Sequence, residues 1–298
     1  MKKNSLFILF ILFGFLGCWS LSVSAFWQDT TEESPDRPEI ISLLGIKQFA
    51  QPAEGEALIQ LRTDLTEAWK ALQSEPENPE NVILYGRRLA YLWRYHEAID
   101  VYSGGIKKSS DNSMLYRHRG HRFISIRKFD KAVLDLTKAA DLNSLDFDIW
   151  YHLGLAHFLN GDFEKALSAY QSCLGVCEDD ESKVAVSHWL YMTLRRLGKW
   201  DDAIKVLDNI VEGMDVEENQ SYYDLLNFYK GQKTKEDIFV LDKASDLELA
   251  TLGFGIGCWY LYNADVATAK SYFEKIVTTK YWPAFGFIAA EAELSRMK

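Results

Sequence analysis

The sequence predicts an all-α protein, an α-solenoid of stacked antiparallel helix pairs, and three observations support this prediction. An aromatic residue is followed three positions later by alanine at 34-residue intervals, in Tyr95–Ala98, Phe129–Ala132 and Phe163–Ala166. A glycine stands twelve residues before each of these alanines. The composition, with 48% hydrophobic and 26% charged residues, is that of a folded domain rather than a disordered chain.

Close packing between paired helices explains the repeated pattern. Gly86, Gly120 and Gly154 let two helices cross at short distance, and a large residue four positions after each alanine fills the adjacent space. A fourth unit, Trp200–Ala203, follows after 37 residues. A period of this length, with this alternation of small and aromatic residues, resembles the tetratricopeptide repeat. The resemblance extends over residues 55–298 and implies an interaction module rather than an enzyme.

The C-terminal third keeps the pattern in weaker form. Gly257 and Ala269 restore it after a degenerate pair at residues 222–230 and 235–243. A last helix, residues 284–297, is expected to cap the array. Because this helix is unusually apolar for a cap, it is expected to dock on the preceding repeat or on a second copy of the chain.

The first 25 residues are predicted to be a secretory signal peptide. Two lysines precede an apolar run from Leu6 to Trp19, and small residues before the site favour cleavage after Ala25. Two alternatives stay open. The apolar run, if extended to Trp27, is long enough to anchor the chain in a membrane, and Cys18 lies in a sequence that resembles a lipoprotein modification site. The predicted location is therefore the periplasm or cell envelope.

Residues 26–54 are expected to form a linker and an N-terminal segment, followed by the 55–298 repeat array. Residues 28–40 are polar and acidic and contain two prolines, which is typical of a linker. Residues 41–54 have no assigned structure. The first helix is expected at residues 56–73.

Charge and cysteine content limit the classes of partner and fold. The chain carries −10, and loss of the two lysines of the signal gives −10 − 2 = −12. Such an acidic protein is not expected to bind nucleic acid. Beyond the signal, Cys173, Cys177 and Cys258 are too few for a disulfide scaffold and are interpreted as small buried hydrophobic residues. A disulfide between the first two stays open.

The tetratricopeptide resemblance implies that the first helix of each pair lines a concave groove. Helical spacing then identifies the side chains that face this groove. The candidate partner-binding residues are Arg87, Tyr91, Arg117, His121, Tyr151, His188 and Arg195. Their groove is basic and aromatic within an acidic chain, and arginine can hold a carboxylate through two parallel hydrogen bonds. The resemblance to carboxylate-clamp repeats is partial, because the asparagines of that pattern are absent.

No catalytic residue, metal site or cofactor is predicted. His118 and His152 are 34 residues apart, but the segments around the histidines offer no adjacent cysteine or paired acid with metal-ligand spacing. The chain also lacks a phosphate-binding glycine loop and a nucleophile elbow. Stretches such as residues 115–122 and 150–157 resemble a group of exported bacterial repeat proteins, which implies a location and an architecture but no chemistry.

The predicted function is that of a non-catalytic scaffold in the bacterial envelope, which holds a protein or peptide partner in its groove, and acidic peptides are among the candidate partners. Two alternatives are kept: a protein that binds a small anionic ligand, and an enzyme that uses the groove arginines and histidines. Contact with a membrane is expected only through an uncleaved signal or a lipid anchor.

Overall fold

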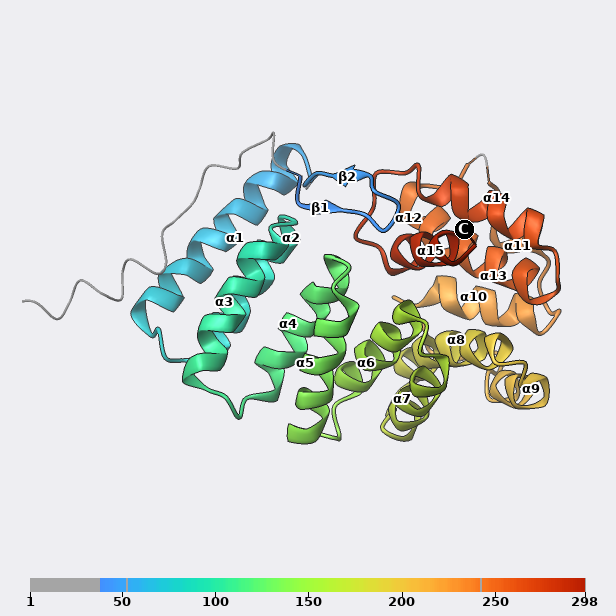
Figure 1. Ribbon diagram of the computed structural model, residues 1–298, viewed down its shortest axis with the longest axis horizontal. Helices are drawn as coiled ribbons and strands as arrows, with labels where there is room; N and C mark the ends of the chain where they lie inside the picture. The colour runs from blue at the N-terminus through green and yellow to red at the C-terminus, as the bar shows by residue number, and fades with distance from the viewer. Residues whose placement is uncertain (1–37, 52, 242, 298) are drawn as a thin grey trace, which may run out of the picture. The chain divides into compact units, whose positions relative to one another are not determined.

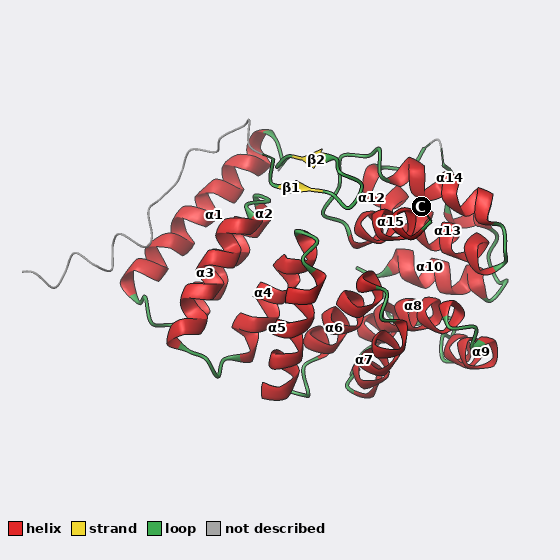
Figure 2. Cartoon of the chain, in the orientation of Figure 1, coloured by secondary structure: helices red, strands yellow, loops and turns green. Residues whose placement is uncertain are grey.

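Nearly all regular structure in the described part of the chain is helical (Figure 2). The computed structural model describes residues 38–51, 53–241 and 243–297. The predicted signal peptide, both alternatives to it, and the first part of the predicted linker lie outside these residues. Among the described residues, none of the helices combines the length and the apolar character needed to cross a bilayer.

Four consecutive helix pairs form the central array, preceded by α1 (Gly55–Ser74), which matches the first predicted helix (Figure 1). The pairs are α2 (Pro79–Tyr91) with α3 (Tyr95–Lys108), α4 (Ser113–Ser125) with α5 (Phe129–Leu142), α6 (Phe147–Asn160) with α7 (Phe163–Gly175), and α8 (Asp180–Arg196) with α9 (Trp200–Asp208). Each helix packs against its neighbours in the chain. The predicted all-α solenoid of helix pairs is confirmed.

Short polar side chains begin the first helix of each pair. Asn78, Asn112 and Asp146 each accept a hydrogen bond from a backbone N–H in the first turn of the helix that follows. Asp179 does the same for α8. Each such cap typically contributes about 1 kcal/mol, because it satisfies a donor that the helix itself leaves free. The first three capping residues are 34 residues apart, so each of these repeats has a helix-capping residue at the same position.

The predicted small residues mark the points where paired helices cross. A methyl group on Gly86 would lie 2.4 Å from Cε1 of Tyr102, and one on Gly154 would lie 2.5 Å from Cε1 of Tyr170. These distances are far shorter than any stable carbon–carbon contact. The aromatic ring therefore fits only because the glycine has no side chain, which explains why the two residue types recur together.

One residue in each turn within a pair adopts the left-handed conformation. In successive pairs these are Trp93 (φ 60°), Arg127 (φ 59°), Gly161 (φ 89°) and Gly198 (φ 70°). Glycine adopts this conformation freely, whereas a residue with a Cβ atom loses about 1–2 kcal/mol there. Trp93 and Arg127 adopt this conformation despite its cost, and both side chains contact the C-terminal segment of the chain.

The C-terminal third is less regular than the central array. It consists of α10 (Gln220–Tyr229), α11 (Lys235–Ile238), α12 (Asp246–Glu248), the π-helical segment η1 (Leu249–Gly253), α13 (Phe254–Tyr262), α14 (Val266–Ile276) and α15 (Phe285–Arg296). Helices α13 and α14 form the pair expected from the glycine at 257, where a methyl group would lie 2.7 Å from the ring of Phe273. The second helix expected after α10 is shorter than predicted and comprises only α11.

The last helix contacts both the preceding repeat and the middle of the array. At Gly286, α15 crosses η1 so closely that a methyl group would lie 1.7 Å from the carbonyl oxygen of Ala250. Arg127, in the turn between α4 and α5, donates from Nε to Oε2 of Glu291 at 2.9 Å. Arg296 donates to two carbonyl oxygens at the end of α6. Docking on the preceding repeat was expected, but these contacts with earlier turns were not.

Two short strands occupy part of the segment to which the sequence assigned no structure. β1 (Ile40–Ile41) pairs antiparallel with β2 (Lys47–Gln48), and Figure 1 shows them between the N-terminal helices and the C-terminal elements. The indole N–H of Trp282 donates to the carbonyl oxygen of Phe49 at 2.8 Å. The ring of Trp93 packs edge-on against the same indole, with centroids 5.3 Å apart. These contacts join the first repeat, the strands and the C-terminal segment.

Candidate functional site

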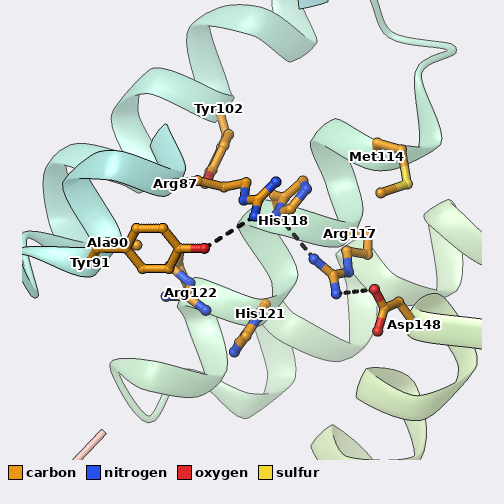
Figure 3. A pocket seen from close by; sticks show the side chains of 10 residues that line it. All are labelled: Arg87, Ala90, Tyr91, Tyr102, Met114, Arg117, His118, His121, Arg122 and Asp148. Atoms are coloured by element: carbon orange, nitrogen blue, oxygen red, sulfur yellow. Dashed lines mark hydrogen bonds and ion pairs between the residues drawn. The ribbon is translucent and has the colours of Figure 1, made fainter. Parts of the chain in front are cut away.

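A polar pocket of about 340 Å³ lies among the first helices of three successive pairs (Figure 3). Its lining residues are Arg87, Ala90 and Tyr91 of α2, Tyr102 of α3, Met114, Arg117, His118, His121 and Arg122 of α4, and Asp148 of α6. Four of the seven predicted groove residues meet here. They are Arg87, Tyr91, Arg117 and His121.

The cations of the pocket are balanced to different degrees. Arg117 forms an ion pair with Asp148 at 2.5 Å and contacts the ring of His118 at 3.2 Å. Arg87 donates from Nη2 to the hydroxyl of Tyr91 at 3.1 Å. The guanidinium of Arg122 lies over the ring of Tyr95, 5.2 Å from its centroid. Within the described residues, no carboxylate forms an ion pair with Arg87 or Arg122.

The histidines beside these arginines carry no charge near neutral pH. Burial, reinforced by Arg117, lowers the pKa of His118 far below its ordinary value. Burial likewise lowers the pKa of His121, and Arg122 adds to the effect. A neutral imidazole can donate one hydrogen bond without adding charge. Three guanidinium groups and one carboxylate therefore leave the pocket with two positive charges, although the chain as a whole is acidic.

The predicted groove residues Tyr151 and His188 lie away from this pocket in packed surroundings. His188 is only 1% exposed, and its ring stacks on that of Tyr222 in α10 with centroids 4.4 Å apart. Burial lowers the pKa of His188 to about 3. Tyr151 is also buried, and burial is the main cause that raises the pKa of its phenol. Helix α10 thus covers positions that the repeat pattern places on an open face.

The seventh predicted residue, Arg195, is held by aromatic rings at the end of α8. Its guanidinium lies 3.9 Å from the ring centroid of Trp200 and donates to the hydroxyl of Tyr191. A further hydrogen bond joins it to the side chain of Asn263. The structure therefore separates Arg195 from the arginines of the pocket and gives it a packing role between repeats.

The C-terminal segment also covers part of the face that the sequence assigned to the groove. The ring of Phe285 lies 5.3 Å from that of His121 and 5.8 Å from that of His152, between ring centroids. The two histidine rings are 4.3 Å apart. This arrangement is an aromatic contact between the array and the start of α15. The pocket is the part of the predicted face beside this contact.

Residues 38–51, 53–241 and 243–297 contain neither a cluster of metal ligands nor a disulfide. This part of the chain contains no group of three or more histidine, cysteine, aspartate or glutamate side chains that could hold a metal ion. Cys173 and Cys258 are buried free thiols, and Cys177 is a half-buried free thiol.

Sequence reasoning missed several residues of the pocket, above all Arg122 and His118. The groove positions were assigned by following one row of α4 through Arg117 and His121. His118 and Arg122 form the neighbouring row, four residues apart on the same helix. The dense run of basic residues from 115 to 122 is the signal that could have revealed them.

The comparisons with known proteins agree with this architecture. Residues 117–175 match the sequence profile of the tetratricopeptide repeat family. The BBSome complex member BBS4 of Bos taurus is 27% identical over 134 residues, which is 45% of this chain and 25% of that protein. Small glutamine-rich tetratricopeptide repeat-containing protein 2 of Saccharomyces cerevisiae is 28% identical over 104 residues, 35% of this chain and 30% of its own. The chain thus spans less than a third of either relative.

Among solved structures, that of the MamA protein aligns with 59% of this chain and 88% of its own, at 17% identity and a TM-score of 0.45. The family match covers α4 to α7, the same helices that carry the 34-residue period, its caps and its glycine crossings. The chain therefore contains tetratricopeptide repeats within residues 117–175.

Proposed function

We propose that this protein is a non-catalytic scaffold of the bacterial envelope that binds an acidic segment of a protein or peptide partner at the pocket of α2, α4 and α6. The tetratricopeptide repeat fold supports protein–protein interaction in general. The observation that supports this pocket as the binding site is its uncompensated positive charge. Arg87 and Arg122 offer guanidinium groups that form no ion pair with a carboxylate within the described residues.

An acidic partner follows from the energetics of these arginines. Burial lowers the pKa of Arg122, and the nearby Arg117 lowers it further. Each guanidinium is nonetheless charged at neutral pH, so the folded chain keeps two cations close together. An anion at the pocket would form charge-assisted hydrogen bonds with these guanidinium groups. A carboxylate-rich segment supplies that anion, whereas nucleic acid is disfavoured by the acidic surface elsewhere.

The absence of catalysis in the proposal rests on the chemistry of the lining. The ten pocket residues include no serine, cysteine, threonine or lysine that could act as a nucleophile. The carboxylate in the pocket, that of Asp148, forms an ion pair with Arg117. These residues are suited to holding an anion.

The proposed location rests on the N-terminal sequence, whose basic start, apolar run and small residues at 23 and 25 are typical of an export signal.

A second candidate function, binding of a small anionic ligand, is favoured by the size of the pocket, since about 340 Å³ lies within the range of small-molecule sites.

Capture from an envelope extract tests the proposal. The mature chain and its Arg87→Ala, Arg117→Ala double variant serve as baits, and bound proteins are identified by mass spectrometry. Lys138→Ala is the matched control, because it removes a cation from the exposed face of α5. A protein retained by the wild type and by the control, but lost with the double variant, supports the proposal. Equal retention by all three baits contradicts it.

A further inference from the structure

The pocket holds more positive charge and more hydrogen-bond donors than a single carboxylate requires. One arginine guanidinium, whose N–H groups form a planar fork, satisfies one carboxylate through two parallel hydrogen bonds. Here two guanidinium groups, those of Arg87 and Arg122, form no ion pair with a carboxylate among the described residues. Both line the pocket together with His118 and His121 (Figure 3). The two neutral imidazoles add donors without adding charge.

Charge balance gives the charge of the ligand. Asp148 neutralises Arg117 through the 2.5 Å ion pair, which leaves two guanidinium charges. A monoanion would leave one of these guanidinium charges without an anion, and a neutral ligand would leave both. A group with two negative charges on oxygen atoms that point in several directions matches two separate forks and the imidazole donors. A phosphate monoester has this charge and this tetrahedral arrangement of acceptors.

We propose that the Arg87–Arg122 pocket is a binding site for a dianionic phosphate group, either as a phosphate monoester or as free phosphate. The inference deepens the proposed function, because it names the group recognised at the same pocket, and it does not depend on the identity of the partner. Arg87 and Arg122 contact the oxygen atoms. Arg117 lines the site while paired with Asp148. Tyr91 orients Arg87, because its hydroxyl accepts a hydrogen bond from the Arg87 guanidinium.

Titration calorimetry in phosphate-free buffer tests this site with three probes: phenyl phosphate, inorganic phosphate and benzoate. We expect phenyl phosphate to bind at pH 7.5 and to bind roughly tenfold more weakly at pH 5, where only about a tenth of the monoester keeps its second charge. Benzoate, with one charge and the same ring, is expected to bind at least tenfold more weakly than phenyl phosphate at pH 7.5. Inorganic phosphate that binds as tightly as the ester identifies the free ion as the ligand, and weaker binding identifies the ester.

Variants separate a specific site from general attraction to cations. Arg87→Gln and Arg122→Gln each remove one fork, and each is expected to weaken phosphate binding roughly tenfold to hundredfold. Lys138→Gln removes the same charge from the exposed face of α5 and is expected to leave binding unchanged. Arg122→Lys keeps the charge and the packing on Tyr95 but loses the fork, so it is expected to bind more weakly than the wild type while folding normally.

Three results would overturn the inference. They are no binding of either phosphate probe at millimolar concentration, equal binding of benzoate and phenyl phosphate, and unchanged binding in folded Arg87→Gln and Arg122→Gln variants. These outcomes leave the proposed scaffold function intact if the captured partner still depends on Arg87 and Arg117. Conversely, phosphate binding without any captured partner would contradict the scaffold and keep the phosphate site.

Discussion

Replacement of Arg127 by alanine is expected to destabilise the fold by about 3–5 kcal/mol, because it leaves a buried carboxylate without its cation. The Arg127 and Glu291 side chains are 2% and 1% exposed, and Nε lies 2.9 Å from Oε2. The same guanidinium donates to the carbonyl oxygens of Ser125 and Trp282. The alanine variant removes all of these contacts between the second repeat and the C-terminal segment.

Two further variants divide this cost into its physical parts, and a third, at another ion pair, is the control. Arg127→Gly loses the same contacts but relieves the left-handed backbone, so it should be about 1–2 kcal/mol more stable than Arg127→Ala. The double variant Arg127→Met with Glu291→Met removes both charges together and should fall within about 2 kcal/mol of the wild type. Arg88→Ala, which breaks a more exposed pair with Asp64, should cost at most about 1 kcal/mol.

Urea unfolding followed by far-ultraviolet circular dichroism measures these free energies. The reasoning is refuted if Arg127→Ala shifts the unfolding free energy by less than about 1 kcal/mol. It is also refuted if the double methionine variant is as unstable as the single alanine variant. Either result would mean that the contact between the C-terminal helix and the middle of the array contributes little in solution.

Further predictions concern the helix crossings, pH and the N-terminus. Gly154→Ala should cost about 1–3 kcal/mol in urea melts through overpacking, whereas Gly175→Ala, with open space around it, should be neutral or slightly stabilising. Because burial lowers the pKa of His188 to about 3, the unfolded chain binds the proton first, and stability is lost as pH falls from about 6.5 towards 3. In His188→Phe, the unfolding free energy measured from pH 6 to 4 should therefore change less steeply with pH than in the wild type, by up to about 1.4 kcal/mol per pH unit. The intact mass of the exported protein should correspond to a chain that begins at Phe26, and a mass showing lipid on Cys18 would contradict this.

The sequence was sufficient to predict the helix pairs, because the residues that specify them are close together in the chain. A glycine such as Gly154 and its aromatic partner Tyr170 are 16 residues apart, so their spacing recurs in every complete repeat. The prediction of helix positions at both ends of the array succeeded for the same reason. Local spacing carries this information without any knowledge of distant contacts.

The contacts of the C-terminal segment could not be predicted in this way. Arg127 and Glu291 are 164 residues apart, and Trp282 reaches Phe49 across 233 residues. No repeated spacing of residues in the sequence indicates such long-range contacts. In hindsight, a tryptophan and an arginine at 93 and 127, where the following repeats have glycine, were the available signal, since strained turns are retained for a reason.

The candidate site was predicted in part for a related reason. The spacing of first helices correctly brought Arg87 and Arg117 to one pocket, because their positions follow from the repeat. The same spacing placed His188 on an open face, but α10 covers it, and α10 belongs to the irregular region of the chain. Arg122 lies on the neighbouring row of α4, outside the row that the groove pattern follows.

The central claim is that the pocket of Arg87 and Arg117 carries the binding activity of this protein. Its most direct test is the affinity of the captured partner for the wild type and for the Arg87→Ala, Arg117→Ala variant, measured by calorimetry at low and high salt. Binding should weaken by roughly 1.5–3 kcal/mol for each charged hydrogen bond lost, with a larger effect at low salt, while both proteins remain folded at the assay temperature. Unchanged affinity in the folded double variant would contradict the claim and place the binding surface elsewhere on the array.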